Sequence, residues 1–149
     1  MLSKCLFSIF LIMLSSASLA KNWQVQMLNY GSGKDGGMIF QPAYIHASLG
    51  DTVTFIPTHS GHNAQSYVVP KDAKQWKTPL DKEYTVALDQ EGIHLYYCPP
   101  HLMMGMVGVI QVGEAKNLSL VEKKAPRLRA KMALKPERID ALLANIQVP

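Results

Sequence analysis

The sequence predicts an all-β domain, a Greek-key sandwich or barrel of two sheets, followed by two short C-terminal α-helices. Two observations favour this fold class: many short strand-like segments separated by turn residues fill residues 21–113, and the composition then shifts toward helix formers over residues 114–149. The chain has 149 residues, of which 48% are hydrophobic and 17% are charged. That balance is typical of a folded globular protein and excludes a disordered chain.

The strand predictions rest on side-chain alternation and on β-branched or aromatic runs. Residues 23–29 and 51–57 alternate apolar with polar side chains, which is the period-two pattern of a half-buried strand. Apolar or β-branched runs predict the remaining strands at 38–42, 43–47, 83–88, 93–98 and 107–112. The segment 57–82 lacks clear periodicity and is expected to form a long loop, which in a compact β domain is often functional.

The C-terminal extension, residues 114–149, is rich in Ala, Leu, Lys, Arg and Glu. Pro126 and Pro136 occupy positions where helices can begin. After Pro136, apolar residues recur at helical spacing, namely Ile139, Leu142, Leu143 and Ile146. We therefore expect two short helices packed against the sandwich rather than a frayed tail.

Residues 1–20 have the three parts of a secretory signal: a basic start, an apolar run over residues 6–14 and a small-residue end before Ala20. The alternative, a membrane anchor, is disfavoured because the run is shorter than the ~20 residues that span a bilayer. Export would remove Cys5 and leave Cys98 as a lone thiol outside the cytoplasm, with no membrane-inserted segment. Such a thiol is either buried and inert or engaged in chemistry such as metal binding.

The formal net charge of +4 is mildly basic. It is compatible with an acidic protein partner. It does not indicate nucleic-acid binding, because no basic groove with interleaved aromatic residues accompanies it.

The run from Cys98 to Met106 gathers a thiol, an imidazole and three thioethers between two predicted strands: Cys98, His101, Met103, Met104 and Met106. Thiolate and thioether ligands combined with imidazole select copper. A trigonal His₂Cys site with a weak axial methionine suits one-electron transfer. The residues alone leave open which methionine would be axial, since methionine is most often core filler.

A second histidine must come from elsewhere in the chain. His62 follows the strand at 51–57 and is preceded by Gly61, so it is favoured; His59 is expected to be an exposed loop residue. His94 shares strand parity with Cys98, but four extended residues place it ~13 Å away, so we expect it to be a buried, hydrogen-bonded residue.

The motif Cys98-x₂-His101-x₄-Met106 with an upstream histidine resembles the signature of the cupredoxin family, and within it that of the pseudoazurins. The stretches 43–63 and 104–113, and the two trailing helices, extend the resemblance over 21–149. The resemblance implies one type 1 copper ion with His62, Cys98, His101 and Met106 as its ligands. It also implies that Asn63 ties the copper loops together, although Pro99 stands where relatives often carry Thr or Ser.

The resemblance further implies a periplasmic one-electron carrier, not an enzyme, that cycles its copper between Cu(I) and Cu(II). Redox proteins such as c-type cytochromes and nitrite reductase would dock transiently near His101, and a monomer is expected. Two other functions compete with this one. The same ligands would serve a copper or zinc carrier, and Cys98 with His101 or His62 would serve a thiol enzyme.

Overall fold

The computed structural model describes residues 19–31 and 36–149. Nearly all of the predicted signal segment, residues 1–18, lies outside the described residues, as do residues 32–35. Among the described residues, no helix has both the length and the apolar character needed to cross a membrane.

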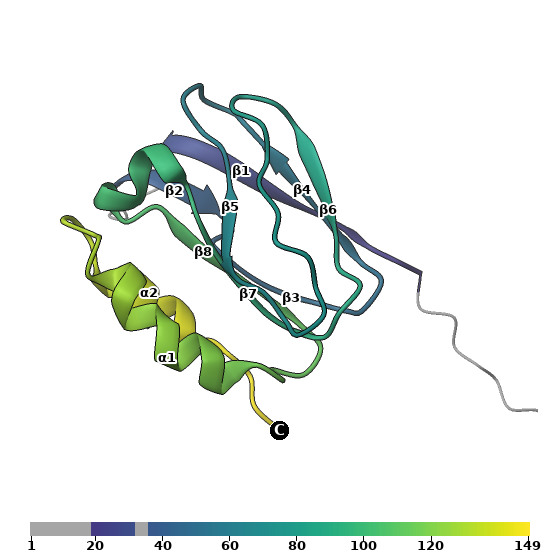
Figure 1. Ribbon diagram of the computed structural model, residues 1–149. Coiled ribbons are helices and arrows are strands. Elements are labelled where there is room, and N and C mark those ends of the chain that lie inside the picture. The colour runs from purple at the N-terminus through teal and green to yellow at the C-terminus, as the bar shows by residue number, and fades with distance from the viewer. Residues whose placement is uncertain (1–18, 32–35) are drawn as a thin grey trace, which may run out of the picture.

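Eight strands form two four-stranded sheets that face each other (Figure 1). The first sheet has the strand order β2 (Gly37–Gln41), β1 (Asn22–Tyr30), β4 (Thr52–Ile56), β6 (Tyr84–Ala87). The second sheet has the order β3 (Tyr44–Ala47), β8 (Val107–Val112), β7 (Gly92–Tyr97), β5 (Gln65–Val68). The predicted two-sheet sandwich is therefore confirmed, and seven of its strands lie where side-chain alternation and β-branched runs predicted them.

The chain passes between the sheets at Pro42, which separates β2 of the first sheet from β3 of the second. The pairs β1–β4 and β3–β8 are parallel, and the other strand pairs are antiparallel. Strands that are distant in sequence thus become neighbours, as in the pairing of Ile45 with Ile110.

Aromatic side chains fill the interior between the sheets. Tyr96 lies against Phe40 and Phe55, with ring centroids 4.8 Å and 5.3 Å away, and the ring of Trp76 lies 5.6 Å from that of Tyr96. Cys98 belongs to the same buried cluster, so the inner core continues directly into the region of the predicted site.

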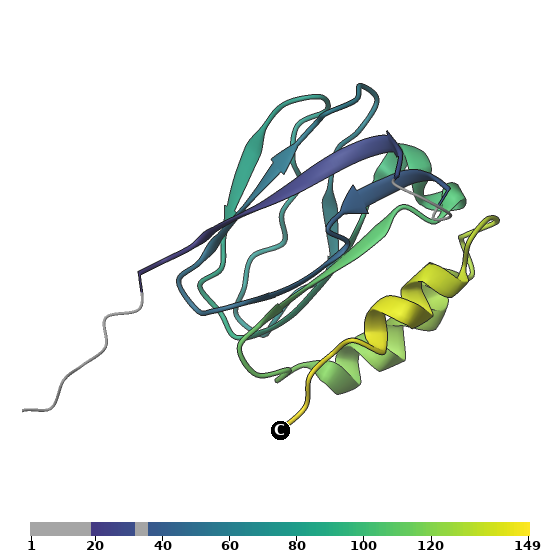
Figure 2. The same ribbon diagram turned by 180° about the vertical axis from the view of Figure 1, so that it is seen from behind.

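Two helices, α1 (Leu118–Arg129) and α2 (Glu137–Leu143), lie side by side along the outer face of the second sheet (Figures 1 and 2). They pack on the outward side chains of β7 and β8, which explains why these two strands are buried on both faces. The expected helix start at Pro136 is confirmed. The expected start at Pro126 is wrong, because Val121, Ala125 and Leu128 already form a buried stripe and α1 begins at Leu118.

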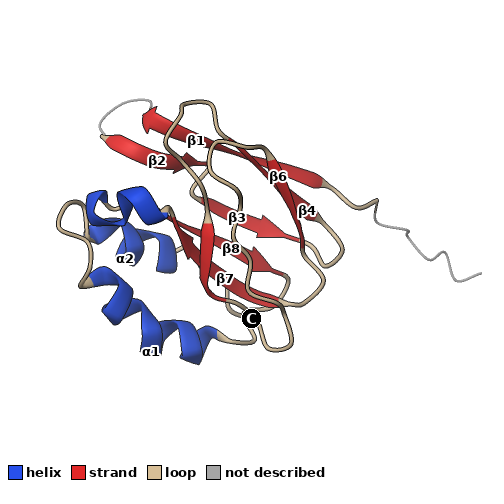
Figure 3. Cartoon of the chain, turned by 45° about the horizontal axis from the view of Figure 1, so that its top comes forward, coloured by secondary structure: helices blue, strands red, loops and turns tan. Residues whose placement is uncertain are grey.

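The segment 57–82, expected to be one loop, contains β5, which Figure 1 labels; Figure 3 draws the loops of the chain in tan. Its short strand QSYV alternates half-buried with buried side chains, and four residues are too few to stand out as a period in the sequence.

Candidate metal centre

Two connections between strands contribute the candidate ligands. His62 lies in the loop that leads from β4 of the first sheet to β5 of the second. The other three predicted ligands lie on the connection between β7 and β8, in the second sheet. That connection is a short helical turn, η2 (Pro99–Met104), which begins with two prolines and ends at Gly105 in the left-handed conformation (φ 80°). Folding the turn this tightly brings both ends of the Cys98–Met106 run together, and the Cys98 N–H donates to the Met106 carbonyl at 2.9 Å.

His62, Cys98 and His101 converge on one point. Cys98 Sγ lies 3.8 Å from His62 Nδ1 and 3.5 Å from His101 Nδ1. The potential ligand atoms of these three residues all lie within 4.8 Å of one another. Sequence spacing therefore selected three residues that the fold does bring together.

These separations fit a shared metal ion. An ion bound about 2.3 Å from a thiolate sulfur and about 2.0–2.1 Å from an imidazole nitrogen sets the two ligand atoms roughly 3.5–3.8 Å apart at tetrahedral to trigonal angles. The observed 3.5 Å and 3.8 Å match that range. The donor set of one thiol and two imidazoles is one that suits copper.

Met106 is fully buried and belongs to the same core cluster as Cys98. Its main chain is bonded to two of the converging residues: its carbonyl accepts from Cys98, and its N–H donates to the His101 carbonyl at 3.2 Å. Met103, by contrast, is 66% exposed. Met106 therefore lies near the point of convergence, whereas Met103 is directed to the surface.

Asn29 at the end of β1 orients His62. The His62 Nε2–H donates to Asn29 Oδ1 at 2.7 Å, since an amide oxygen only accepts. That bond places the imidazole proton on Nε2 and leaves the Nδ1 lone pair free to bind a metal. The role of Asn29 was not predicted from the sequence. A polar residue near the end of a predicted strand was the available signal, and nothing in the sequence indicated that its partner would be His62.

His59 is half-buried rather than solvent-exposed as expected. Its Nδ1 accepts a hydrogen bond from the Asn29 N–H at 3.0 Å. His59 therefore binds Asn29, the residue that orients His62, and it does not belong to the cluster of His62, Cys98 and His101.

Asp81 fixes the backbone of the His62 loop. Its Oδ1 accepts from the N–H groups of Gly61, at 2.6 Å, and His62, at 3.0 Å. Gly61 has φ 92°, a conformation that strains other residues and lets the chain turn here. Burial lowers the pKa of His62, and the proximity of His101 lowers it further, while Asp81 opposes both effects. Burial also lowers the pKa of His101, so the surroundings of both candidate imidazoles favour the neutral form, which is the form that binds a metal.

Burial raises the pKa of the Cys98 thiol, and the backbone N–H groups of Asn63 and His101 partly oppose this. Pro99 and Pro100 carry no N–H, so the donors toward the sulfur come from these other two residues. A thiol with a raised pKa is a poor nucleophile at neutral pH, whereas a bound metal ion removes its proton.

Asn63 connects the loops in a way that sequence reasoning did not specify. Its side-chain amide donates to the Thr78 carbonyl at 3.2 Å, and its backbone N–H acts on the Cys98 sulfur. The Asn63 side chain thus binds the segment before Asp81, and its backbone N–H binds Cys98, the residue that follows β7.

The other singled-out residues lie away from the cluster. His94 is buried as expected, and its Nδ1 accepts from Trp76 Nε1 at 3.2 Å. Burial lowers the pKa of His94 to about 4. His46 is exposed, and Trp23 and Trp76 pack against the core.

Comparison with known proteins identifies similar chains. The family of copper binding proteins of the plastocyanin/azurin type matches residues 26–113. Pseudoazurin from Paracoccus pantotrophus is 36% identical over 140 residues, covering 91% of each chain. A putative pseudoazurin from Rhizobium leguminosarum bv. viciae is 41% identical over 137 residues, covering 89% of this chain and 85% of the relative. The crystal structure of native pseudoazurin from Hyphomicrobium denitrificans has a TM-score of 0.74 at 32% identity, covering 85% of this chain and 98% of that one.

Proposed function

Because the chain belongs to the plastocyanin/azurin family of copper-binding proteins, which carry electrons on copper, we propose that it is a periplasmic one-electron carrier with a single type 1 copper site. The observation that carries the proposal is the convergence of Cys98 Sγ with the Nδ1 atoms of His62 and His101 at ion-sized separations.

The proposed ligands are His62, Cys98, His101 and Met106. Bound copper supplies the one-electron couple between Cu(I) and Cu(II). The protein's contribution is rigidity: Asn29 fixes the ring of His62, and η2 fixes the spacing from Cys98 to His101. A donor set held in this way would present nearly the same arrangement to either oxidation state, so little would have to rearrange when an electron moves.

His101 is the proposed electron port. It is partly exposed, whereas His62, Cys98 and Met106 have no exposed surface. Three exposed apolar side chains lie near this surface. Pro100 and Met103 are close to His101 in the chain, and Leu80 lines the same surface pocket as Pro100. A small apolar surface of this kind suits brief docking and rapid exchange. We propose that c-type cytochromes and nitrite reductase are its partners, that the protein acts as a monomer, and that the segment 1–20 directs export.

The test is the visible spectrum of residues 21–149 with Cu(II). We expect an intense blue absorption from a copper–thiolate bond, lost in Cys98→Ser and in His62→Ala. His46→Ala is the matched control, because His46 is exposed and its ring bonds only to the Gly113 carbonyl among the described residues. Met106→Leu should stay blue but change in reduction potential, whereas Met103→Leu should leave the potential unchanged.

The same experiment separates the rival functions. A protein that binds copper or zinc tightly and stays colourless would favour a metal carrier. A protein that binds neither metal would favour the thiol enzyme, although the raised pKa of Cys98 counts against it, since a nucleophilic cysteine needs a lowered one.

A further inference from the structure

We propose that Arg138, on the C-terminal helix α2, is a positioning residue for the loop that carries Met106. The proposal rests on the proposed copper site and adds a residue from outside the predicted β domain. It follows from a set of bonds between the start of α2 and the turn between η2 and β8.

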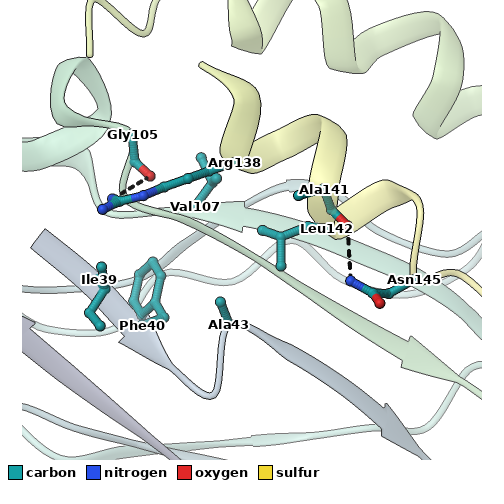
Figure 4. Close-up of a pocket in the computed structure, with 9 residues that line it drawn as sticks. All are labelled: Ile39, Phe40, Ala43, Gly105, Val107, Arg138, Ala141, Leu142 and Asn145. Atoms are coloured by element: carbon teal, nitrogen blue, oxygen red, sulfur yellow. Dashed lines mark hydrogen bonds between the residues drawn. The ribbon is translucent and has the colours of Figure 1, made fainter. Parts of the chain in front are cut away.

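The Arg138 guanidinium joins two backbone segments, and Figure 4 shows its bond to one of them at the Gly105 carbonyl. Its Nη1 donates to the Gly105 carbonyl at 3.2 Å and to the Met38 carbonyl at 3.0 Å, with the Met104 carbonyl at 3.5 Å. Its Nη2 donates to the Gly37 carbonyl at 3.2 Å. One side chain thus ties the metal loop to β2, the edge strand of the first sheet.

These bonds act on the peptide that leads into Met106. The Gly105 carbonyl also accepts from the Val107 N–H at 3.1 Å, so the Gly105–Met106 peptide is held from the helix side and from β8. The peptide on the other side of Met106 is held by Cys98. With both flanking peptides bonded, the position of the Met106 Cα relative to Cys98 and His101 is restricted, and Arg138 supplies side-chain support for it from α2.

The connection between α1 and α2 supports the same loop independently. The N–H groups of Ala133 and Leu134 both donate to the Met103 carbonyl, at 2.9 Å and 2.8 Å. A Cβ on Gly105 would lie 2.8 Å from the Leu134 carbonyl oxygen and 3.0 Å from Lys135 Cβ, so the two backbones are in close contact. The helical extension is therefore packed directly on the metal loop as well as on the sheet.

Arginine suits this place for two physical reasons. Its planar guanidinium presents several N–H donors in a fixed fork, so one side chain can bond carbonyls from two segments. Beyond the guanidinium, α2, β2 and β8 line a half-open, largely apolar pocket of about 190 Å³, with Leu142, Phe40 and Val107 in its walls (Figure 4). The Arg138 side chain also lines this pocket, so methionine at position 138 would keep the apolar stem and remove the donors.

The experiment compares wild type with Arg138→Met, Arg138→Lys and Arg129→Met. Arg129→Met is the matched control, because Arg129 makes an exposed ion pair with Asp140 at 2.9 Å on the same pair of helices. The first readout is amide hydrogen exchange of the metal-free proteins. We expect the Met106 and Val107 amides to exchange at least tenfold faster in Arg138→Met than in wild type, and at the wild-type rate in Arg129→Met.

The second readout is the copper-loaded spectrum, in particular the intensity ratio of its charge-transfer bands, together with the reduction potential. Arg138→Lys keeps the charge but loses the fork, so a positioning role predicts an altered band ratio in both Arg138 variants. Wild-type band ratios in both would overturn the proposal, even with faster exchange in Arg138→Met. If Arg138→Met does not fold, the band ratio of Arg138→Lys compared with that of wild type decides whether the proposal holds. A colourless wild-type protein would overturn the proposed function instead, and the exchange rates would still decide whether Arg138 holds the loop.

Discussion

Replacing Asn29 with alanine tests whether the amide at the end of β1 prepares His62 for metal binding. The substitution removes only the side-chain acceptor of His62 Nε2–H, because the bond from Asn29 to His59 comes from the main chain and survives. The change is therefore confined to one hydrogen bond of 2.7 Å to a histidine that is 0% exposed.

The magnitude follows from two independent considerations. A buried N–H left without an acceptor costs about 1–3 kcal/mol. Removing the orienting partner of a metal-binding histidine typically lowers metal affinity about 10–100-fold, which converts to about 1.4–2.8 kcal/mol. The first figure is the expected loss of folding stability, which falls on the metal-free and the loaded protein alike, and the second is the expected loss of copper affinity, one to two powers of ten.

The assay is a titration of copper against a competing chelator at fixed pH. Asn22→Ala is the matched control, since Asn22 is an asparagine on the same strand whose Oδ1 accepts only from Thr52 and Thr54 among the described residues. Wild-type affinity in Asn29→Ala would refute the reasoning, as would an equal loss in Asn22→Ala.

Three further predictions concern stability. Burial holds His94 neutral in the folded state with a pKa of about 4, while the unfolded chain protonates near 6.5, so stability is full above pH 6.5 and is lost as pH falls toward 4. The expected contribution of His94 to this loss in the free energy of unfolding is about 3 kcal/mol, measured by denaturant titration at pH values across this range. The loss should be smaller by that amount in His94→Gln, and parallel pH curves for wild type and variant would contradict this. Leu128→Ala, at a buried position of α1, should lower the free energy of unfolding by about 2–5 kcal/mol, and the half-exposed Leu120→Ala by much less, so equal losses would count against the packing of α1. Gly108→Ala should cost about 1–3 kcal/mol by the same assay, because the new Cβ meets the ring of Tyr96; unchanged stability would show that Tyr96 moves freely.

Sequence reasoning reached furthest where a residue's role depends on local pattern. Strands with alternating or β-branched residues were predictable because burial on one face imposes a period of two. Cys98 and His101 were predictable as a pair because they lie three residues apart on a short connection between two predicted strands, where the chain has to turn, and it turns there as η2. The strand β5 was missed because four residues give too short a pattern, and the start of α1 was misplaced because a proline can also occur inside a helix, on its exposed side.

The supporting residues of the site were not predictable in this way. Asn29 lies 33 residues from its partner His62, and Arg138 lies 33 residues from Gly105. Each partnership is created by the tertiary fold, and neither residue type is unusual at its position in the chain. A donor or acceptor acquires this kind of role only once its partner is known, so the ligands could be proposed from the sequence while the groups that orient them could not.

The candidate site joins two connections of the fold: the loop from β4 to β5, which carries His62, and the connection from β7 to β8, which carries Cys98, His101 and Met106. An ion held there would cross-link chain segments that lie 36 residues apart, as measured from His62 to Cys98. Because these ligands separate when the chain unfolds, binding favours the folded state by mass action, by about 4 kcal/mol when free copper is 1,000-fold above its dissociation constant. The loaded protein should therefore melt at a higher temperature than the metal-free one, and heat should release the metal and part the two sheets in a single step.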